Sequence, residues 1–381
     1  MIGEYLKKMY RSMISEDKTY KIQKRKLHYW SFSFFMAIGV SMLLNSCSEE
    51  PKNGFVNRNL RYEIKGEAQG TTYSMLYYSD SIQISKDEVD SILDEIDLAA
   101  SIWVDSSLIS KMNRSQDTLI LIHDTTGFFT DNFQLSKEVY TNTDGAYNPT
   151  VGKLVNAWGF GFKNKEKMDS TKVDSLLQSV GFNDDQMWMT QKNGQWWMHK
   201  TNAQTHLDFN GIAQGYSVDV LAHYFSEKGI SDYMIEVGGE LIAHGSKPDE
   251  ILWNVGIDLP SDQNMTRNLA ATLKLDNVAV ATSGNYRKFY EVDGVRYAHT
   301  LNPKTGFPVQ HSLLSATVVM DNCALADAYA TAFMVMGYEA AKELVESRPE
   351  LGINAYFIYS KSDGQMQTYF SPGLENMIKE L

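Results

Sequence analysis

The stretch THLDFNGIAQGYSVDVLAHYFSEKGISDYMIEVGGE, residues 205–240, decides how the rest of the chain is organised. Its first residues alternate in polarity, which predicts a strand running into Asp208-Phe209-Asn210-Gly211. An apolar pattern at helical spacing follows, and then a second short strand that ends at Gly238-Gly239. A carboxylate and glycines beside the start of a helix suit a phosphate or a metal ion. The alternative is a tight turn in which Asp208 only caps the helix.

The first 47 residues have the composition of an export signal rather than of a folded domain. Eight Lys and Arg residues precede an apolar run, Trp30–Leu44, and small residues then lead to Cys47. This order is typical of a signal peptide, and the run is too short for a comfortable membrane span. The position of Cys47 favours an exported lipoprotein, anchored to a membrane by a lipid on Cys47 and facing the periplasm, with surface display also possible. The alternative is a signal anchor with an incidental cysteine.

This interpretation divides the chain into a lipoprotein signal peptide at 1–47, a tether at 48–57 and a folded domain at 58–381. Because the first 47 residues hold eight basic and three acidic side chains, the rest has 27 basic against 44 acidic ones, a net charge of −17. So acidic a surface argues against nucleic acid as a partner. An anionic ligand would therefore need a metal ion or backbone amides. Only Cys323 remains after Cys47, which excludes an intramolecular disulfide in the mature chain.

Strands and helices are mixed along the folded domain without the regular alternation of a parallel-sheet protein. Ser85 and Glu88 form a capping box before a helix, and Asn193-Gly194 between two short strands indicates a hairpin. The Ala-rich segment Cys323–Gly337 predicts a buried helix. Together these patterns predict an α+β fold with largely antiparallel pairing. Other strands are expected at 60–66, 71–78, 253–257, 269–275, 278–282, 288–292, 296–301, 315–320, 354–359 and 366–370. Other helices are expected at 128–141, 169–180 and 338–347. Loops are expected at 102–113, with a turn of helix, and at 144–152.

Two further positions have side chains that could take part in chemistry. Asp327 and Thr331 are four apart on the buried helix, so their oxygens project from one face. An ionised Asp there is costly unless it is paired or bound to a metal, although it could simply cap a neighbouring loop. His299 precedes a Pro/Gly turn and is a candidate general base, or a histidine that only bonds a turn carbonyl. Oxygen ligands of this kind favour Mg²⁺.

Eight motifs together give the chain a clear resemblance to the ApbE family, the FAD:protein FMN transferases. They follow one another in the family's order and span almost the whole folded domain. They are GTTY at 70–73, the loop 103–113, YNPTVGKLVNAWGFG at 147–161, LDFNGIAQGYSVD at 207–219, EVGGE at 236–240, TSGNYR at 282–287, HTLNPKTGFPV at 299–309 and DAYATA at 327–332.

The resemblance implies a T-fold-related architecture of mixed, largely antiparallel sheets with packed helices. It also implies a Mg²⁺-dependent reaction that cleaves FAD and attaches FMN by a phosphodiester bond to a Thr or Ser of an acceptor flavoprotein, releasing AMP. By position, the metal would be bound by Gly211 through its carbonyl, Asp327 and Thr331, and His299 would be the catalytic base. The flavin nucleotide would be contacted by Gln69, Trp103, Ala146, Tyr147, Asn148, Asp208, Gln214 and Leu301.

The chain departs from the family's pattern at three of these positions. Gln69 stands where Met is usual, Gln214 where Lys is usual and Asn148 where Asp is common. Gln214 keeps a hydrogen-bonding group but lacks a positive charge near the nucleotide. Two other functions stay open: an FAD pyrophosphatase that yields FMN and AMP, and a flavin-binding lipoprotein without activity. The family's usual acceptors are subunits of membrane-bound oxidoreductases.

Overall fold

The computed structural model describes residues 60–160, 166, 168–260, 268–285, 289–292, 295–298 and 300–381. The described residues other than Thr125–Gly127 form one compact unit. The signal peptide and tether predicted at 1–57 lie outside the described residues. No helix in the part that is described is long and apolar enough to cross a membrane.

The largest sheet of the described residues has eight strands, and each neighbouring pair is antiparallel. This confirms the predicted α+β class with antiparallel sheets. The sheet begins with a hairpin whose turn residues, Gln69 and Gly70, both have positive φ, as a tight two-residue turn requires. In spatial order the strands are β1 (Leu60–Ala68), β2 (Thr71–Ser79), β6 (Asp232–Val237), β7 (Glu240–His244), β10 (Val278–Gly284), β13 (Leu313–Met320), β14 (Asn354–Ser360) and β15 (Met366–Phe370).

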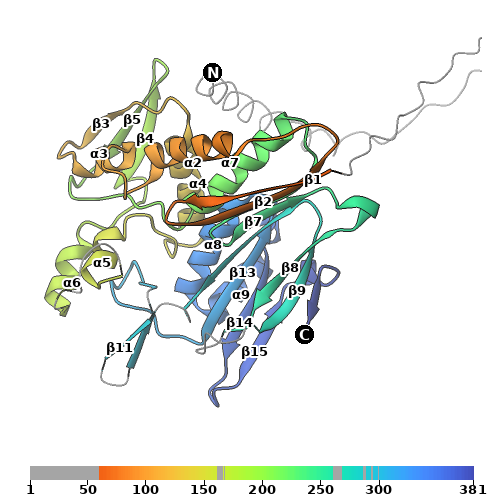
Figure 1. The fold of residues 1–381 in the computed structure, drawn as a ribbon. Coiled ribbons are helices and arrows are strands. Elements are labelled where there is room, and N and C mark those ends of the chain that lie inside the picture. The colour runs from red at the N-terminus through yellow and green to blue at the C-terminus, as the bar shows by residue number, and fades with distance from the viewer. Residues whose placement is uncertain are drawn as a thin grey trace, which may run out of the picture. The chain divides into compact units, whose positions relative to one another are not determined.

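A row of helices covers one face of this sheet (Figure 1). They are α2 (Lys86–Ala100) on β1, α7 (Ala213–Glu227) on β6 and β7, α8 (Cys323–Met336) on β10 and β13, and α9 (Tyr338–Ser347) on β14. The predicted capping box starts α2, with Ser85 and Glu88 in the expected reciprocal bonds. Asp219 of α7 fixes the start of α8, because its carboxylate accepts from the N–H groups of Cys323 and Ala324 at 2.9 Å each.

A small three-stranded sheet covers the opposite face of the large sheet. Side chains alternate along β10, so that Val280 packs into the same core cluster as Trp253 and Leu273 of the small sheet, whereas Ala279 and Ala281 lie on the other side, towards α8. This alternation is the two-residue period of a strand buried on both faces. The small sheet consists of β8 (Trp253–Asp258), β9 (Leu269–Leu275) and β16 (Ile378–Glu380).

The remaining elements are the sheet of β3 (Leu119–Ile122), β5 (Gln195–Lys200) and β4 (Met187–Lys192), the hairpin of β11 (Phe289–Val292) and β12 (Val295–Ala298), helices α3 (Leu108–Arg114), α4 (Phe128–Asn142), α5 (Gly152–Ala157) and α6 (Ser170–Leu177), and short 3₁₀ turns at Pro248–Glu250, Pro349–Leu351 and Pro372–Leu374. Among these elements, α5 with the loop before it and the segment after β12 contribute to the site described below.

One predicted strand is wrong. Residues 205–209 belong to no strand, although Thr205, Leu207 and Phe209 are buried in alternation. The side chain of Asn113 takes the place of a partner strand: its amide donates to the Leu207 carbonyl over 2.7 Å and its oxygen accepts from the Leu207 N–H over 2.8 Å. The segment is thus extended and half-buried, so its residues alternate in burial like those of a strand although it forms no hydrogen-bond ladder with another strand. Strands β3, β7 and β16 were not predicted.

Candidate active site

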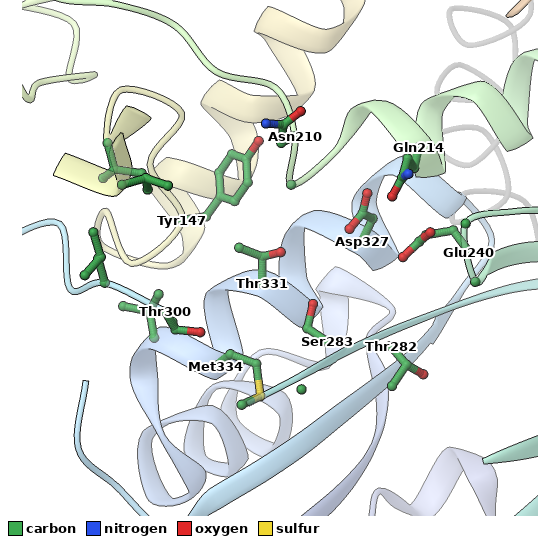
Figure 2. Close-up of a pocket in the computed structure, with 18 of the residues that line it drawn as sticks. Tyr147, Asn210, Gln214, Glu240, Thr282, Ser283, Thr300, Asp327, Thr331 and Met334 are labelled. Atoms are coloured by element: carbon green, nitrogen blue, oxygen red, sulfur yellow. The ribbon is translucent and has the colours of Figure 1, made fainter. Parts of the chain in front are cut away.

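A cavity of about 670 Å³ opens where the start of α7, the middle of α8 and the end of β10 meet. Its size is within the range of small-molecule binding sites. Figure 2 shows side chains from all three elements directed into it. The loop before α5, α5 itself, the turn between β6 and β7, the end of β8 and residues 300–303 also contribute to the wall. The polar and glycine residues of that wall are Asn148, Asp208, Asn210, Gly211, Gln214, Gly238, Gly239, Glu240, Gly256, Asp258, Thr282, Ser283, Gly284, Thr300, Asp327 and Thr331.

Two hydrogen bonds hold the segment that leads into α7 in place. The N–H of Asp208 donates to the Pro149 carbonyl over 2.7 Å, and Asp208 Oδ1 accepts from the Asn210 N–H over 2.9 Å. The N-cap residue is Ile212, and no side chain caps the helix there. The alternative in which Asp208 caps α7 is therefore wrong. The N–H groups of Ile212 and Ala213 donate to the Phe209 carbonyl, so that the N–H of Gln214, a residue of the cavity wall, is the one in this turn left to meet an anion.

Helices α7 and α8 approach each other closely at Gly215. A Cβ on Gly215 would lie 2.4 Å from the Cys323 carbonyl oxygen, so only glycine fits. The contact allows the Gly215 N–H to donate to Asp327 Oδ2 over 3.3 Å. Asp327 therefore bonds the first turn of a helix, whereas the alternative was that it caps a neighbouring loop, and it also lines the cavity.

Gly211 lies beside Thr331 in the wall of the cavity. A Cβ on Gly211 would be 3.2 Å from Thr331 Oγ1 and 3.4 Å from Tyr147 Cε2. The Gly211 backbone and the Thr331 hydroxyl thus lie close together, and Asp327 lies one helical turn before Thr331 (Figure 2). The structure brings together all three residues that the sequence suggests as metal ligands.

The cavity is strongly acidic. Four carboxylates line it, on Asp208, Glu240, Asp258 and Asp327, and no Lys, Arg or His is among its described lining residues. Burial raises the pKa of Asp208 to about 6, and the N–H bond from Asn210 opposes that rise. Burial likewise raises the pKa of Asp327 to about 7, against the bond from Gly215. Buried carboxyl groups of this kind are stable when they are protonated, and they are stable as ions only when a cation compensates their charge.

Glu240 is a site residue that the sequence did not single out. It is the first residue of β7, directly after the turn Gly238-Gly239, whose φ angles are +70° and +112°. Burial and the nearby charge of Asp327 raise the pKa of the Glu240 carboxyl well above its ordinary value. The available signal was the carboxylate after two glycines in EVGGE, but the sequence could not show that it meets Asp327.

Most of the other predicted nucleotide contacts also line the cavity. Ala146, Tyr147 and Asn148 come from the loop before α5, Gln214 from the first turn of α7, and Leu301 from the segment after β12. Asn148 Oδ1 accepts from the Thr150 N–H and hydroxyl at 2.9 and 2.7 Å, which fixes this loop. Tyr147 is buried, and its hydroxyl lies 3.2 Å from Ser136 Oγ.

Three predicted residues are placed differently. Gln69 lies in the β1–β2 turn, where its amide donates to Ser217 Oγ over 2.8 Å, and it is not among the residues that line the cavity. Trp103 is 63% exposed and is also absent from that lining. His299 lies outside the described residues, but its chain neighbour Thr300 lines the cavity. The roles predicted for these three residues remain predictions.

The described residues contain no group of three or more His, Cys, Asp or Glu side chains that could hold a metal alone. A cation in this cavity would therefore combine one or two carboxylates with neutral oxygens. Mg²⁺ characteristically binds in this way, through few protein carboxylates, together with waters and substrate phosphates.

Comparison with known proteins places the chain among flavin transferases. The sequence profile described as the ApbE family matches residues 69–357. The FAD:protein FMN transferase of Vibrio cholerae is 32% identical over 322 residues, covering 83% of this chain and 91% of that protein. The FAD:protein FMN transferase of Escherichia coli K12 is 28% identical over 358 residues, covering 91% and 98% respectively.

Solved structures agree with this result. The flavin transferase ApbE from Vibrio cholerae superposes with a TM-score of 0.72 at 29% identity, over 84% of this chain and all of that one. The ApbE protein from Thermotoga maritima gives a TM-score of 0.70 at 26% identity, over 84% and 100%. The mixed fold with antiparallel sheets is thus the fold of these proteins.

Proposed function

The chain belongs to the ApbE family, and we propose that the cavity between α7, α8 and β10 is where it transfers FMN from FAD to an acceptor protein. It is an FAD:protein FMN transferase, like the relatives that match most of its length. The reaction forms a phosphodiester between FMN and a Thr or Ser hydroxyl and releases AMP.

One observation carries the assignment to this cavity: four carboxylates and no described cation surround a space of ligand size. A pyrophosphate would be repelled from such a site unless a metal ion accompanied it. The available donors are hard oxygens, which suit Mg²⁺ rather than a softer metal. The residues therefore fit Mg²⁺, and when bound it would neutralise pyrophosphate oxygens and the charge on the leaving AMP.

We assign the metal to the Asp327 carboxylate, the Thr331 hydroxyl and the Gly211 carbonyl. A Cβ added at Gly211 would touch the Thr331 hydroxyl, so the two residues are neighbours in the cavity wall, and the Gly215 N–H orients Asp327. The first turn of α7 adds the backbone N–H and the side chain of Gln214 to the cavity wall. These neutral donors provide hydrogen bonds to phosphate where the family commonly has a lysine.

The flavin nucleotide lies, in this proposal, along the wall formed by Ala146–Asn148, Asp208 and Leu301. Tyr147 and Leu301 are buried and offer apolar surface, while Asp208 and Asn148 offer polar contacts. Gln69 and Trp103 stay candidates for contact with a part of FAD that extends beyond the described cavity.

His299 is proposed as the general base. It would take the proton from the acceptor hydroxyl as that oxygen bonds to the FMN phosphorus and the bond to AMP breaks. The neighbouring Thr300 is held at the cavity by a 2.7 Å bond from its hydroxyl to Asn285 Oδ1. This anchoring supports a base that reaches the cavity from the same segment.

We also propose that the enzyme is exported and held at a membrane by a lipid on Cys47. The basic and apolar run before Cys47 supports this location. In the periplasm or on the cell surface, the acceptor would be an exported flavoprotein subunit of a membrane oxidoreductase.

Release of AMP tests the proposed reaction. The full chain is incubated with FAD and Mg²⁺, with and without an acceptor protein, and AMP is quantified. We expect AMP release to depend on the acceptor and to equal the FMN attached. Equally rapid AMP release without acceptor would instead identify an FAD pyrophosphatase, and binding of FAD without cleavage would identify a flavin-binding protein.

A further inference from the structure

Glu240 occupies a position in the cavity wall where hydrogen bonds satisfy only part of its carboxylate. Its side chain is 8% exposed and yet lines the cavity. The Gly238-Gly239 turn folds β7 back along β6, with Glu240 paired opposite Val237, and Glu240 lines the same cavity as Gln214 of α7 and Asp327 of α8. A carboxylate this deeply buried normally has a partner.

One oxygen of Glu240 has no such partner. Oε2 is inaccessible to water and makes no hydrogen bond within the described residues. Leaving a buried carboxylate oxygen unsatisfied costs several kcal/mol when the group is charged. No described lining residue of the cavity is basic, so the side chains in view cannot compensate this charge.

The unsatisfied carboxylate faces Asp327. Figure 2 shows the carboxylates of Glu240 and Asp327 turned towards each other below Gln214, although they come from a strand and a helix far apart in sequence. Two facing carboxylates repel each other in the absence of a cation and become favourable when one divalent ion lies between or beside them. A purely structural Glu would have been replaced at less cost by Gln or by an apolar residue.

We propose that Glu240 is a further ligand-bearing residue for the divalent cation, acting from β7 opposite the Asp327–Thr331 face of α8. This inference rests on the proposed function and adds one carboxylate to its metal site. The metal would then be held by groups from three separate segments, the loop before α7, α8 and β7. Its binding would lock the β6–β7 turn to the helices.

Direct measurement of Mn²⁺ binding tests this role. The full chain in detergent is titrated with Mn²⁺, and free Mn²⁺ is followed by electron paramagnetic resonance. We expect Glu240→Gln, which keeps size but removes charge, to weaken Mn²⁺ binding by roughly tenfold or more. Glu236→Gln is the matched control, since Glu236 lies on β6 just before the same turn and is absent from the cavity lining. Gln at 236 can still accept the Gly239 N–H, which Glu236 Oε1 now accepts over 2.6 Å.

Thermal unfolding in EDTA gives a second readout that a structural role would not produce. Because Glu240→Gln removes an uncompensated charge, the metal-free variant should unfold at the same or a higher temperature than the parent chain. Its stabilisation by added Mn²⁺ should be lost. If Glu240→Gln does not fold, Glu240→Asp keeps the charge but shortens its reach, and should weaken Mn²⁺ binding in the same direction.

Asp327→Asn separates failure of this inference from failure of the proposed function. If Asp327→Asn loses Mn²⁺ binding while Glu240→Gln binds as tightly as Glu236→Gln, the role of Glu240 is overturned and the metal site stands. If Asp327→Asn also binds Mn²⁺ normally, the metal site of the proposed function is itself wrong.

Discussion

Gly215 on α7 and Asp327 on α8 are joined directly, since the Gly215 N–H donates to Asp327 Oδ2 over 3.3 Å across 112 positions of sequence. The same close approach that excludes a Cβ at Gly215 also sets the distance between the start of α7 and the face of α8 that we propose binds the metal. The geometry of the site therefore depends on helix packing as well as on the ligands themselves.

Gly215→Ala should destabilise the protein in spite of the better helix propensity of alanine. Propensity would gain roughly 1 kcal/mol. The new Cβ, however, would meet a backbone carbonyl oxygen at 2.4 Å, and a backbone group cannot move aside cheaply. Overpacking of this kind costs about 1–3 kcal/mol. Urea denaturation in EDTA measures the effect, and a variant that is more stable than the parent chain would contradict the packing argument.

Thr331→Val should lower the affinity for Mg²⁺ without unfolding the protein. Valine keeps the shape of threonine but removes the hydroxyl that faces Gly211. We expect the Mg²⁺ concentration for half-maximal FMN transfer to rise roughly tenfold. Thr331→Ser keeps the hydroxyl and serves as the control. An unchanged Mg²⁺ requirement in Thr331→Val would remove Thr331 from the metal site.

His299→Ala should reduce FMN transfer by roughly 10²–10⁴-fold, the usual contribution of a general base. FAD binding, followed by flavin fluorescence, should change little. His123→Ala, at an exposed position outside the cavity, controls for the loss of a histidine. A transfer rate within a factor of two of the parent chain would mean that another group takes the proton.

The metal-free protein should become less stable as the pH rises from about 4 to 7. Burial raises the pKa of Asp219 to about 7, whereas an unfolded aspartate titrates near 4. Between these values the folded chain holds a proton that the unfolded chain has released, so the free energy of unfolding falls with rising pH. The stabilisation that comes from the proton on folded Asp219 is fully present below about pH 4 and is lost as the pH passes 7.

Asp219→Asn isolates that contribution, because asparagine still accepts a hydrogen bond at the start of α8 but does not titrate. Urea denaturation in EDTA at several pH values from 5 to 8 should show a flatter pH dependence for the variant. Identical slopes for Asp219→Asn and the parent chain would show that Asp219 is ionised throughout the range.

Much of the fold could be predicted from local signals. The Ser85–Glu88 capping box, the Asn193-Gly194 hairpin and the Ala-rich helix after Asn322 are encoded within a few residues each and form as expected. The segment around Leu207 could not be predicted correctly, because its partner is the side chain of Asn113 rather than a strand. An extended, half-buried segment has the same alternation whichever partner satisfies its backbone.

The site could be predicted in its helical parts and less well elsewhere. Asp327 and Thr331 share a face by helical spacing, and Gly211 precedes a recognisable helix. Glu240 was missed because its importance arises from the encounter of β7 with α8, which no local pattern encodes. Gln69 and Trp103 lie away from the cavity lining, and their expected contacts with FAD depend on resemblance alone.

Mass spectrometry of an intact acceptor protein tests the central claim most directly. The acceptor is incubated with FAD, Mg²⁺ and either the parent chain or Asp327→Asn. The parent chain should increase the acceptor mass by one FMN less water, with the label on a Thr or Ser, and EDTA or Asp327→Asn should prevent this. An unmodified acceptor in a reaction that still converts FAD to FMN and AMP would contradict the claim.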